Sequence, residues 1–96
     1  MNELTILEKL KKLKPILLDK YGIEELALFG SMARGEYNQN SDIDIAILKM
    51  RESNFFLMME AKYFLQKVFN RDIDIGIFDK MKTFVKNRIK KDFIYV

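Results

Sequence analysis

Hydrophobic residues recur along the chain with two different periods, and each period predicts a different kind of element. Leu7, Leu10, Leu13 and Leu17 are spaced by three and four, which is typical of an amphipathic helix. Further along, isoleucines alternate with polar residues, which is typical of strands with one buried face. The pattern predicts these elements in order: a helix over residues 3–20, a strand over 24–29, a short helix opening at Gly30, a strand over 42–48, a helix that Ser53 caps and Asn70 terminates, a strand over 72–77, a helix over 82–91 and a short strand over 93–96.

Individual residues predict how the first helix begins and ends. Thr5 with Glu8 has the form of a capping box, and Asn2 is an alternative N-cap. Pro15 has no N–H to donate, so we expect it to kink this helix or to split it in two. Gly22 suits the left-handed position that closes a helix. The order of elements predicts one α/β (α+β) domain over residues 1–96, with a small mixed sheet flanked by helices.

The composition restricts the chemistry more than it restricts the fold. The 96 residues include no cysteine and no histidine, so any metal must be held by oxygen, which favours Mg²⁺, Mn²⁺ or Ca²⁺. The net charge of +3 is too small to indicate a nucleic-acid partner by itself. No apolar run has the length of a membrane span, and residues 1–14 do not resemble a signal peptide. We therefore expect a cytoplasmic protein with no membrane partner.

Two strands carry paired carboxylates. Asp42 and Asp44 lie two residues apart, so both side chains point to the same face of a strand, while the isoleucines between them point into the core. Asp72 and Asp74 repeat this arrangement. Each pair alone is compatible with an ordinary solvated strand face. If the two strands are neighbours, however, the carboxylates converge, and such a cluster suits the two divalent cations of a two-metal phosphoryl transfer.

The segment before the first pair has the features of a phosphate-binding turn. Gly30 follows a strand and permits close approach of the backbone to a ligand, and Ser31 adds a hydroxyl at the start of a helix. Arg34 lies about one turn later, within reach of a phosphate or of the acidic cluster. A glycine and a serine alone are equally compatible with an ordinary turn. Their combination with the carboxylate pairs is much more specific.

These motifs together resemble the minimal nucleotidyltransferase family of the DNA polymerase β superfamily. The matching residues are Gly30-Ser31-x-Ala33-Arg34-Gly35, Ser41-Asp42-Ile43-Asp44 and Ile73-Asp74-Ile75. The resemblance implies that Asp42 and Asp44 are metal ligands, and that Asp74 is the third carboxylate, which helps to activate the acceptor hydroxyl. It also implies that Gly30 and Ser31 hold the triphosphate of ATP, with two Mg²⁺ ions. Asp72 falls where the family varies, so Asp74 is the preferred third ligand.

The resemblance also implies a partner. Many family members act with a separate HEPN-domain toxin and transfer AMP to one of its tyrosines, which makes them antitoxins. Two other functions stay open: neutralising a partner by binding alone, and nucleotidyl transfer to a small molecule. The intact carboxylate set disfavours the first, and the lack of room for an acceptor domain in so short a chain disfavours the second.

Two surfaces are candidates for contact with a partner. Phe55, Phe56, Met58 and Met59 add apolar surface to a helix that already has a core face, although burial from two sides would also explain them. The segment over residues 80–91 is rich in lysine and arginine, which suits a solvated face, steering of the nucleotide or an acidic partner. We do not expect direct nucleic-acid binding, because this segment has no aromatic platform for bases.

Overall fold

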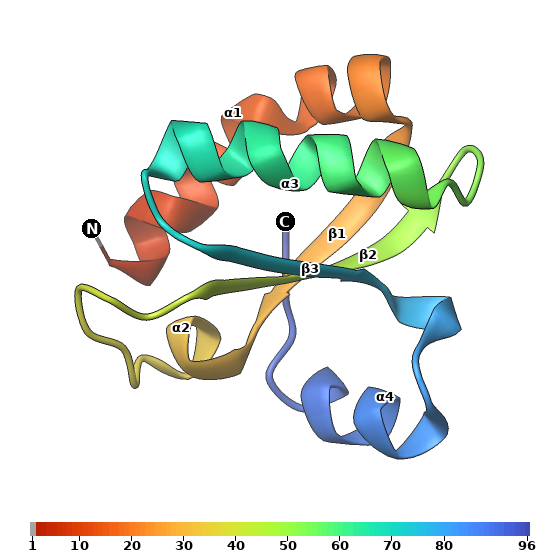
Figure 1. Cartoon of the computed structure of the whole chain (residues 1–96). Coiled ribbons are helices and arrows are strands. Elements are labelled where there is room, and N and C mark those ends of the chain that lie inside the picture. The colour runs from red at the N-terminus through yellow and green to blue at the C-terminus, as the bar shows by residue number, and fades with distance from the viewer. Residues whose placement is uncertain (1) are drawn as a thin grey trace.

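The computed structural model describes residues 2–96, which form a four-stranded mixed sheet with helices on both sides (Figure 1). The strands lie in the order β3-β2-β1-β4. Strand β2 runs antiparallel to β1 and parallel to β3, and β4 runs antiparallel to β1. The strands are β1 (Ile23–Phe29), β2 (Ile43–Met50), β3 (Ile73–Ile77) and β4 (Ile94–Tyr95). The mixed sheet and the order of elements confirm the predicted fold class.

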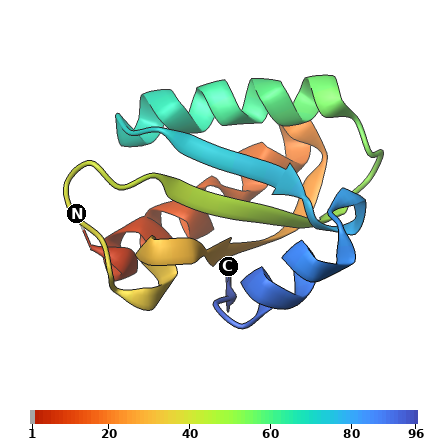
Figure 2. The same cartoon turned by 60° about the horizontal axis from the view of Figure 1, so that its bottom comes forward.

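The helices divide between the two faces of the sheet. Helices α1 (Glu3–Tyr21) and α3 (Phe55–Phe69) lie side by side over one face, whereas α2 (Gly30–Arg34) and α4 (Thr83–Lys90) lie on the other side (Figures 1 and 2). A short 3₁₀ helix, η1 (Phe78–Lys80), follows β3 and was not predicted from the sequence. No helix within residues 2–96 is both long enough and apolar enough to span a membrane.

The hydrophobic core fills the layer between the sheet and the pair α1 and α3. The three isoleucines of β2, which point to one face of the strand, are at most 1% exposed, which confirms that this face is buried. Shifting β2 by one residue would bring Asp44 into this layer, so the core fixes the register of the strand. The main core side chains are Ile6, Leu10, Leu17, Leu28, Ile43, Ile45, Ile47, Ala61, Leu65 and Phe69.

The ends of α1 partly follow the predictions. The helix begins with Asn2 as its N-cap, because Asn2 Oδ1 accepts a hydrogen bond from the Thr5 N–H at 2.9 Å, which excludes Thr5 as the cap. Gly22 closes the helix with a φ of 69°, as predicted. Pro15 lies inside α1 but does not split it. Both Pro15 and Lys11 are exposed, so the Lys11 carbonyl that loses its helical partner can be hydrated.

Helix α3 corrects one expectation and decides between two alternatives. Its N-cap is Asn54 rather than Ser53, because Asn54 Oδ1 accepts from the Leu57 N–H at 3.1 Å. Met58, for which the sequence left both a partner surface and burial in the core open, is buried in the core. Phe55 and Phe56 remain exposed, each by 68%. The helix ends at Asn70, whose φ of 52° is left-handed, as predicted.

Candidate active site

Gly30 joins β1 to α2 and lies directly against a carboxylate. Its φ of 76° belongs to the left-handed region that side chains rarely adopt. A Cβ atom added to Gly30 would lie 2.9 Å from Cγ of Asp44 and closer still to its Oδ2. The pairing of the strands explains this approach, since Phe29 at the end of β1 is paired with Asp44 on β2. Position 30 therefore requires glycine for its backbone conformation and for its missing side chain.

Ser31 lies in the first turn of α2 and is partly buried. The helix has only five residues, so a phosphate at this end would be held by local N–H groups and the Ser31 hydroxyl rather than by a long helix dipole. Met32, the next residue, is fully buried and anchors the turn to the core. The structure thus places Gly30 and Ser31 together at the edge of the carboxylates, and their role as a triphosphate clamp stays a prediction.

The paired carboxylates come from neighbouring strands. Parallel pairing of β2 with β3 sets Asp44 opposite Asp74, and the Ile43 N–H donates to the Asp72 carbonyl at 3.0 Å. Asp42 immediately precedes β2. The intervening isoleucines are buried, so these aspartates lie on the side of the sheet away from α1 and α3. The two acidic strands are therefore neighbours, which is the condition that the sequence set for the carboxylates to converge.

Asp44 is electrostatically the most unusual of these groups. Burial, together with the negative charges of Asp74 and Asp42, raises the pKa of the Asp44 carboxyl from its ordinary value of 3.8 to about 6. The positive charge of Arg34 acts in the opposite direction but is weaker. A carboxylate held between other carboxylates is destabilised unless a proton or a cation neutralises it.

The aspartates have the right donor atoms for a divalent cation, but their side chains are not already arranged around one cation position. Their donor atoms are all hard oxygens, which suit Mg²⁺. Over residues 2–96, however, the side chains do not already form a group of three or more ligands around one point. Mutual repulsion between the carboxylates favours this separation. The pairing of β2 with β3 therefore sets Asp44 opposite Asp74, but the carboxylate side chains do not yet converge on one point.

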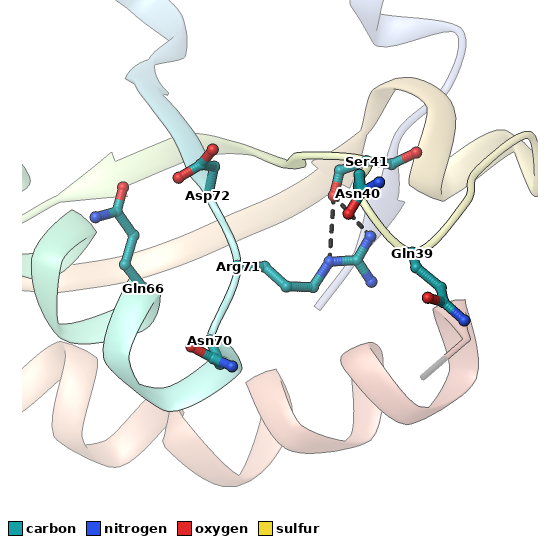
Figure 3. Close-up of a pocket in the computed structure, with 7 residues that line it drawn as sticks. All are labelled: Gln39, Asn40, Ser41, Gln66, Asn70, Arg71 and Asp72. Atoms are coloured by element: carbon teal, nitrogen blue, oxygen red, sulfur yellow. Dashed lines mark hydrogen bonds between the residues drawn. The ribbon is translucent and has the colours of Figure 1, made fainter.

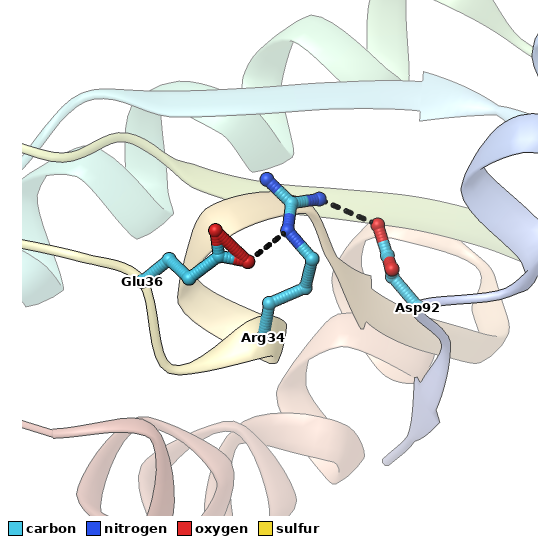
Figure 4. A network of polar contacts seen from close by, with 3 residues as sticks. All are labelled: Arg34, Glu36 and Asp92. Atoms are coloured by element: carbon cyan, nitrogen blue, oxygen red, sulfur yellow. Dashed lines mark hydrogen bonds and ion pairs between the residues drawn. The ribbon is translucent and has the colours of Figure 1, made fainter.

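Arg34 is held beside the site by two acidic partners (Figure 4). Its Nε donates to Glu36 Oε1 at 2.9 Å, and its Nη1 donates to Asp92 Oδ2 at 2.7 Å. These hydrogen bonds, chiefly the one to Asp92, raise the pKa of Arg34 above its ordinary value. Arg34 thus joins α2 to the segment after α4. Its predicted contact with a phosphate stays a prediction, and Asp92 is a neighbour that no pattern in the sequence indicated.

A polar pocket of about 470 Å³ opens where β2 and β3 begin, and Asp72 is the carboxylate that lines it (Figure 3). Side-chain amides contributed by the loop before β2 and by the end of α3 dominate its lining. Its lining residues are Gln39, Asn40, Ser41, Gln66, Asn70, Arg71 and Asp72. Of this set, only Ser41 and Asp72 belong to motifs that the sequence indicated as chemically important. The remaining residues lie in two segments about 30 positions apart, and only the parallel pairing of β2 with β3 brings them together.

Comparison with known proteins identifies the family. A family model described as a nucleotidyltransferase domain matches residues 10–96. The chain therefore belongs to the nucleotidyltransferase domain family and is an enzyme of that class, which confirms the resemblance that the motifs predicted.

Individual relatives are similar over most of their length. A protein of Methanocaldococcus jannaschii, provisionally named a protein adenylyltransferase, is 40% identical over 95% of this chain and 94% of its own length. The protein adenylyltransferase MntA of Thermococcus cleftensis is 24% identical over 86% of this chain and 84% of its own. A crystal structure of a toxin–antitoxin with AMP-PNP superposes with a TM-score of 0.77 at 25% identity, covering 99% of this chain and 72% of that one.

Proposed function

We propose that this chain transfers AMP from Mg²⁺-bound ATP to a tyrosine of a HEPN-domain toxin, and so acts as the antitoxin of that pair. The observation that carries the proposal is the pairing of Asp44 with Asp74 beside the turn at Gly30. Relatives named protein adenylyltransferases support the reaction, and the similar toxin–antitoxin with AMP-PNP supports both the nucleotide and the kind of partner. We further propose that residues 1–96 act as one catalytic domain in the cytoplasm.

The donor nucleotide would bind across the end of β1. In this proposal Gly30 allows the triphosphate to approach the backbone closely, and the Ser31 hydroxyl donates to a phosphate oxygen. Arg34 would contribute positive charge at the same edge, while its ion pairs with Glu36 and Asp92 hold its side chain in place. The three residues lie within one short segment, so together they set the position of the leaving pyrophosphate relative to Asp44.

The carboxylates would carry the chemical step. Asp42, Asp44 and Asp74 would hold two Mg²⁺ ions, whose chemistry is to neutralise the triphosphate and lower the pKa of the attacking hydroxyl. The hydroxyl oxygen forms a bond to the α-phosphorus of ATP, the bond from that phosphorus to the bridging oxygen breaks, and pyrophosphate leaves with the electron pair. Because the chain has no histidine, the hydroxyl proton passes to Asp74, which is exposed and therefore accessible to an acceptor.

A protein acceptor suits the distribution of exposed surface better than a small molecule. The exposed Phe55 and Phe56 follow the end of β2 at Met50. At about 3.3 Å per strand residue, this end of β2 lies about 20 Å from Asp44. The basic segment over residues 80–91 includes α4, on the same side of the sheet as α2. Only a macromolecule can contact the two phenylalanines and still present a hydroxyl to the carboxylates.

The test is to incubate the protein with ATP labelled at the α-phosphate, Mg²⁺ and the HEPN-domain protein encoded beside it. We expect label on a tyrosine of the partner, located by mass spectrometry of the co-expressed pair. Asp74→Asn is the matched control, because it should bind ATP and the partner but transfer nothing. A partner that binds tightly and never carries AMP would establish neutralisation by binding alone and overturn the proposal.

A further inference from the structure

We propose that Arg71 is a positioning residue for the transfer reaction. Its guanidinium group ties the loop before β2 to the start of β3, and this tie holds Asp42 and Asp44 in register with Asp74. The inference rests on the proposed function of these carboxylates. Arg71 would act through the backbone beside them, and we assign it no contact with the substrate.

The contacts of Arg71 are made to main-chain carbonyls rather than to side chains. Its Nε donates to the Ser41 carbonyl at 3.2 Å, and its Nη2 donates to the same carbonyl at 2.6 Å and to the Asn38 carbonyl at 2.9 Å (Figure 3 draws the contacts with Ser41). A guanidinium group suits this task because its donors are fixed in one plane and remain charged at any physiological pH. One side chain thus holds two points of a single loop.

The loop that Arg71 holds is already organised as a turn. The Asn38 N–H donates to Ser41 Oγ at 2.9 Å, and the Ser41 N–H donates back to the Asn38 carbonyl at 3.2 Å. The Asn40 N–H donates to Asn38 Oδ1 at 2.8 Å. Because these bonds make residues 38–41 a local unit, a contact at its two ends positions the whole turn.

The position of Asp42 explains why this tie affects the reaction. Asp42 lies between Ser41, which Arg71 holds, and Ile43, whose N–H makes the first contact between β2 and β3 at the Asp72 carbonyl. Asp42 itself precedes the first residue of β2. The pairing between β2 and β3 therefore fixes the backbone after Asp42 but not the backbone before it. Without Arg71, residues 38–41 would keep their own turn but lose this tie to the start of β3, and the spacing between Asp42 and Asp74 would vary.

Arg51 provides a matched control. It lies just beyond the other end of β2, and its guanidinium group likewise donates to a main-chain carbonyl, that of Leu18 at the end of α1. The two arginines therefore make the same kind of contact at opposite ends of one strand. Replacing either one by alanine should lower stability, but only Arg71 adjoins the carboxylates.

The experiment compares Arg71→Ala with Arg51→Ala in the full chain. We measure the affinity for Mn²⁺ by calorimetry, the amide hydrogen exchange of Ile43 by NMR, and the kinetics of transfer. For Arg71→Ala we expect about tenfold weaker Mn²⁺ binding or more, as for other residues that orient metal ligands, and faster exchange at Ile43. The kcat should fall more than the KM for ATP rises, because Gly30 and Ser31 are untouched. For Arg51→Ala we expect the Mn²⁺ affinity and the exchange rate of Ile43 to remain at the wild-type level.

Arg71→Lys should recover part of the Mn²⁺ affinity, since an ammonium group keeps the charge but replaces the planar fork by one nitrogen. If Arg71→Ala does not fold, Arg71→Lys and Arg51→Lys provide the same comparison. Equal Mn²⁺ affinity and equal Ile43 exchange in the two arginine variants would overturn the inference. A failure of the proposed function is distinguishable, because it would appear as absent transfer and absent Mn²⁺ binding in the wild-type protein itself.

Discussion

Replacing Asp44 by asparagine should stabilise the metal-free protein while abolishing transfer. Asparagine has nearly the same shape as aspartate, so the close contact with Gly30 is preserved and only the charge is removed. The pKa of Asp44 rises from 3.8 to about 6, mainly through burial and the nearby Asp74. At about 1.4 kcal/mol per pKa unit, the ceiling on the destabilisation is about 3 kcal/mol. Solvent reaches this half-buried group, so we expect a net gain of about 1–2 kcal/mol in the free energy of unfolding.

The pH dependence follows from the direction of the shift. Because the pKa is higher in the folded protein than in the unfolded chain, the wild type loses stability as the pH rises from about 4 to about 6, and the whole penalty is present above pH 6. The advantage of Asp44→Asn should therefore be complete near pH 7.5 and absent near pH 4. Added Mg²⁺ and ATP should reverse the order, because only the wild type gains binding energy from them.

Urea denaturation in EDTA, followed by circular dichroism at both pH values, measures this difference. A gain of 1 kcal/mol corresponds to about 4–8 °C in Tm for a chain of this size. Asp72→Asn is the control, because Asp72 is an exposed aspartate just before the neighbouring strand and its removal should change stability by less than about 0.5 kcal/mol. Lower stability of Asp44→Asn at pH 7.5, or an equal gain at pH 4, would refute this account of the site.

Three further substitutions test other parts of the site. Gly30→Ala should destabilise the fold by about 2 kcal/mol or more and abolish transfer, because the new Cβ meets the Asp44 carboxylate at a positive φ; a thermal melt within 2 °C of wild type would contradict this. Ser31→Ala should weaken ATP binding by about 1–2 kcal/mol with little change in Tm, and calorimetry showing equal affinity would mean that Ser31 only shapes the turn. Asp74→Asn should keep ATP binding and lose transfer, whereas Asp72→Asn should keep both; the reverse result in a turnover assay would exchange their roles.

The faces of the strands could be predicted from the sequence because alternation has a strict period. The run Asp42 to Ile47 has only one register that buries its isoleucines, so the aspartates must lie on the opposite side. The parallel pairing of β2 and β3 was also accessible, since a helix between two strands is the usual parallel crossover. The element ends were less certain: Ser53 and Asn54 are both good caps, and only the backbone conformation decides between them.

The contacts that depend on distant segments could not be predicted. Arg34 meets Asp92 across 58 positions of the chain, and Arg71 meets the loop at Asn38 across 33. Charge alone does not select such partners, because the chain contains 17 basic and 14 acidic residues that would satisfy the same rule. The choice between burial and exposure of Met58 could not be made from the sequence for a related reason, since it depends on how closely α3 packs on the sheet.

The contact between Gly30 and Asp44 also restricts how this site can change over generations. While position 44 carries a carboxylate, any side chain at position 30 collides with it, so the two positions are linked by strong epistasis. Once the carboxylate is replaced by a small residue, the collision disappears and only the positive φ still favours glycine. Among relatives, a side chain at the position of Gly30 should therefore appear only after the carboxylate has been lost. Such a substitution would identify lineages that have abandoned catalysis, and the reverse path would require glycine to return first.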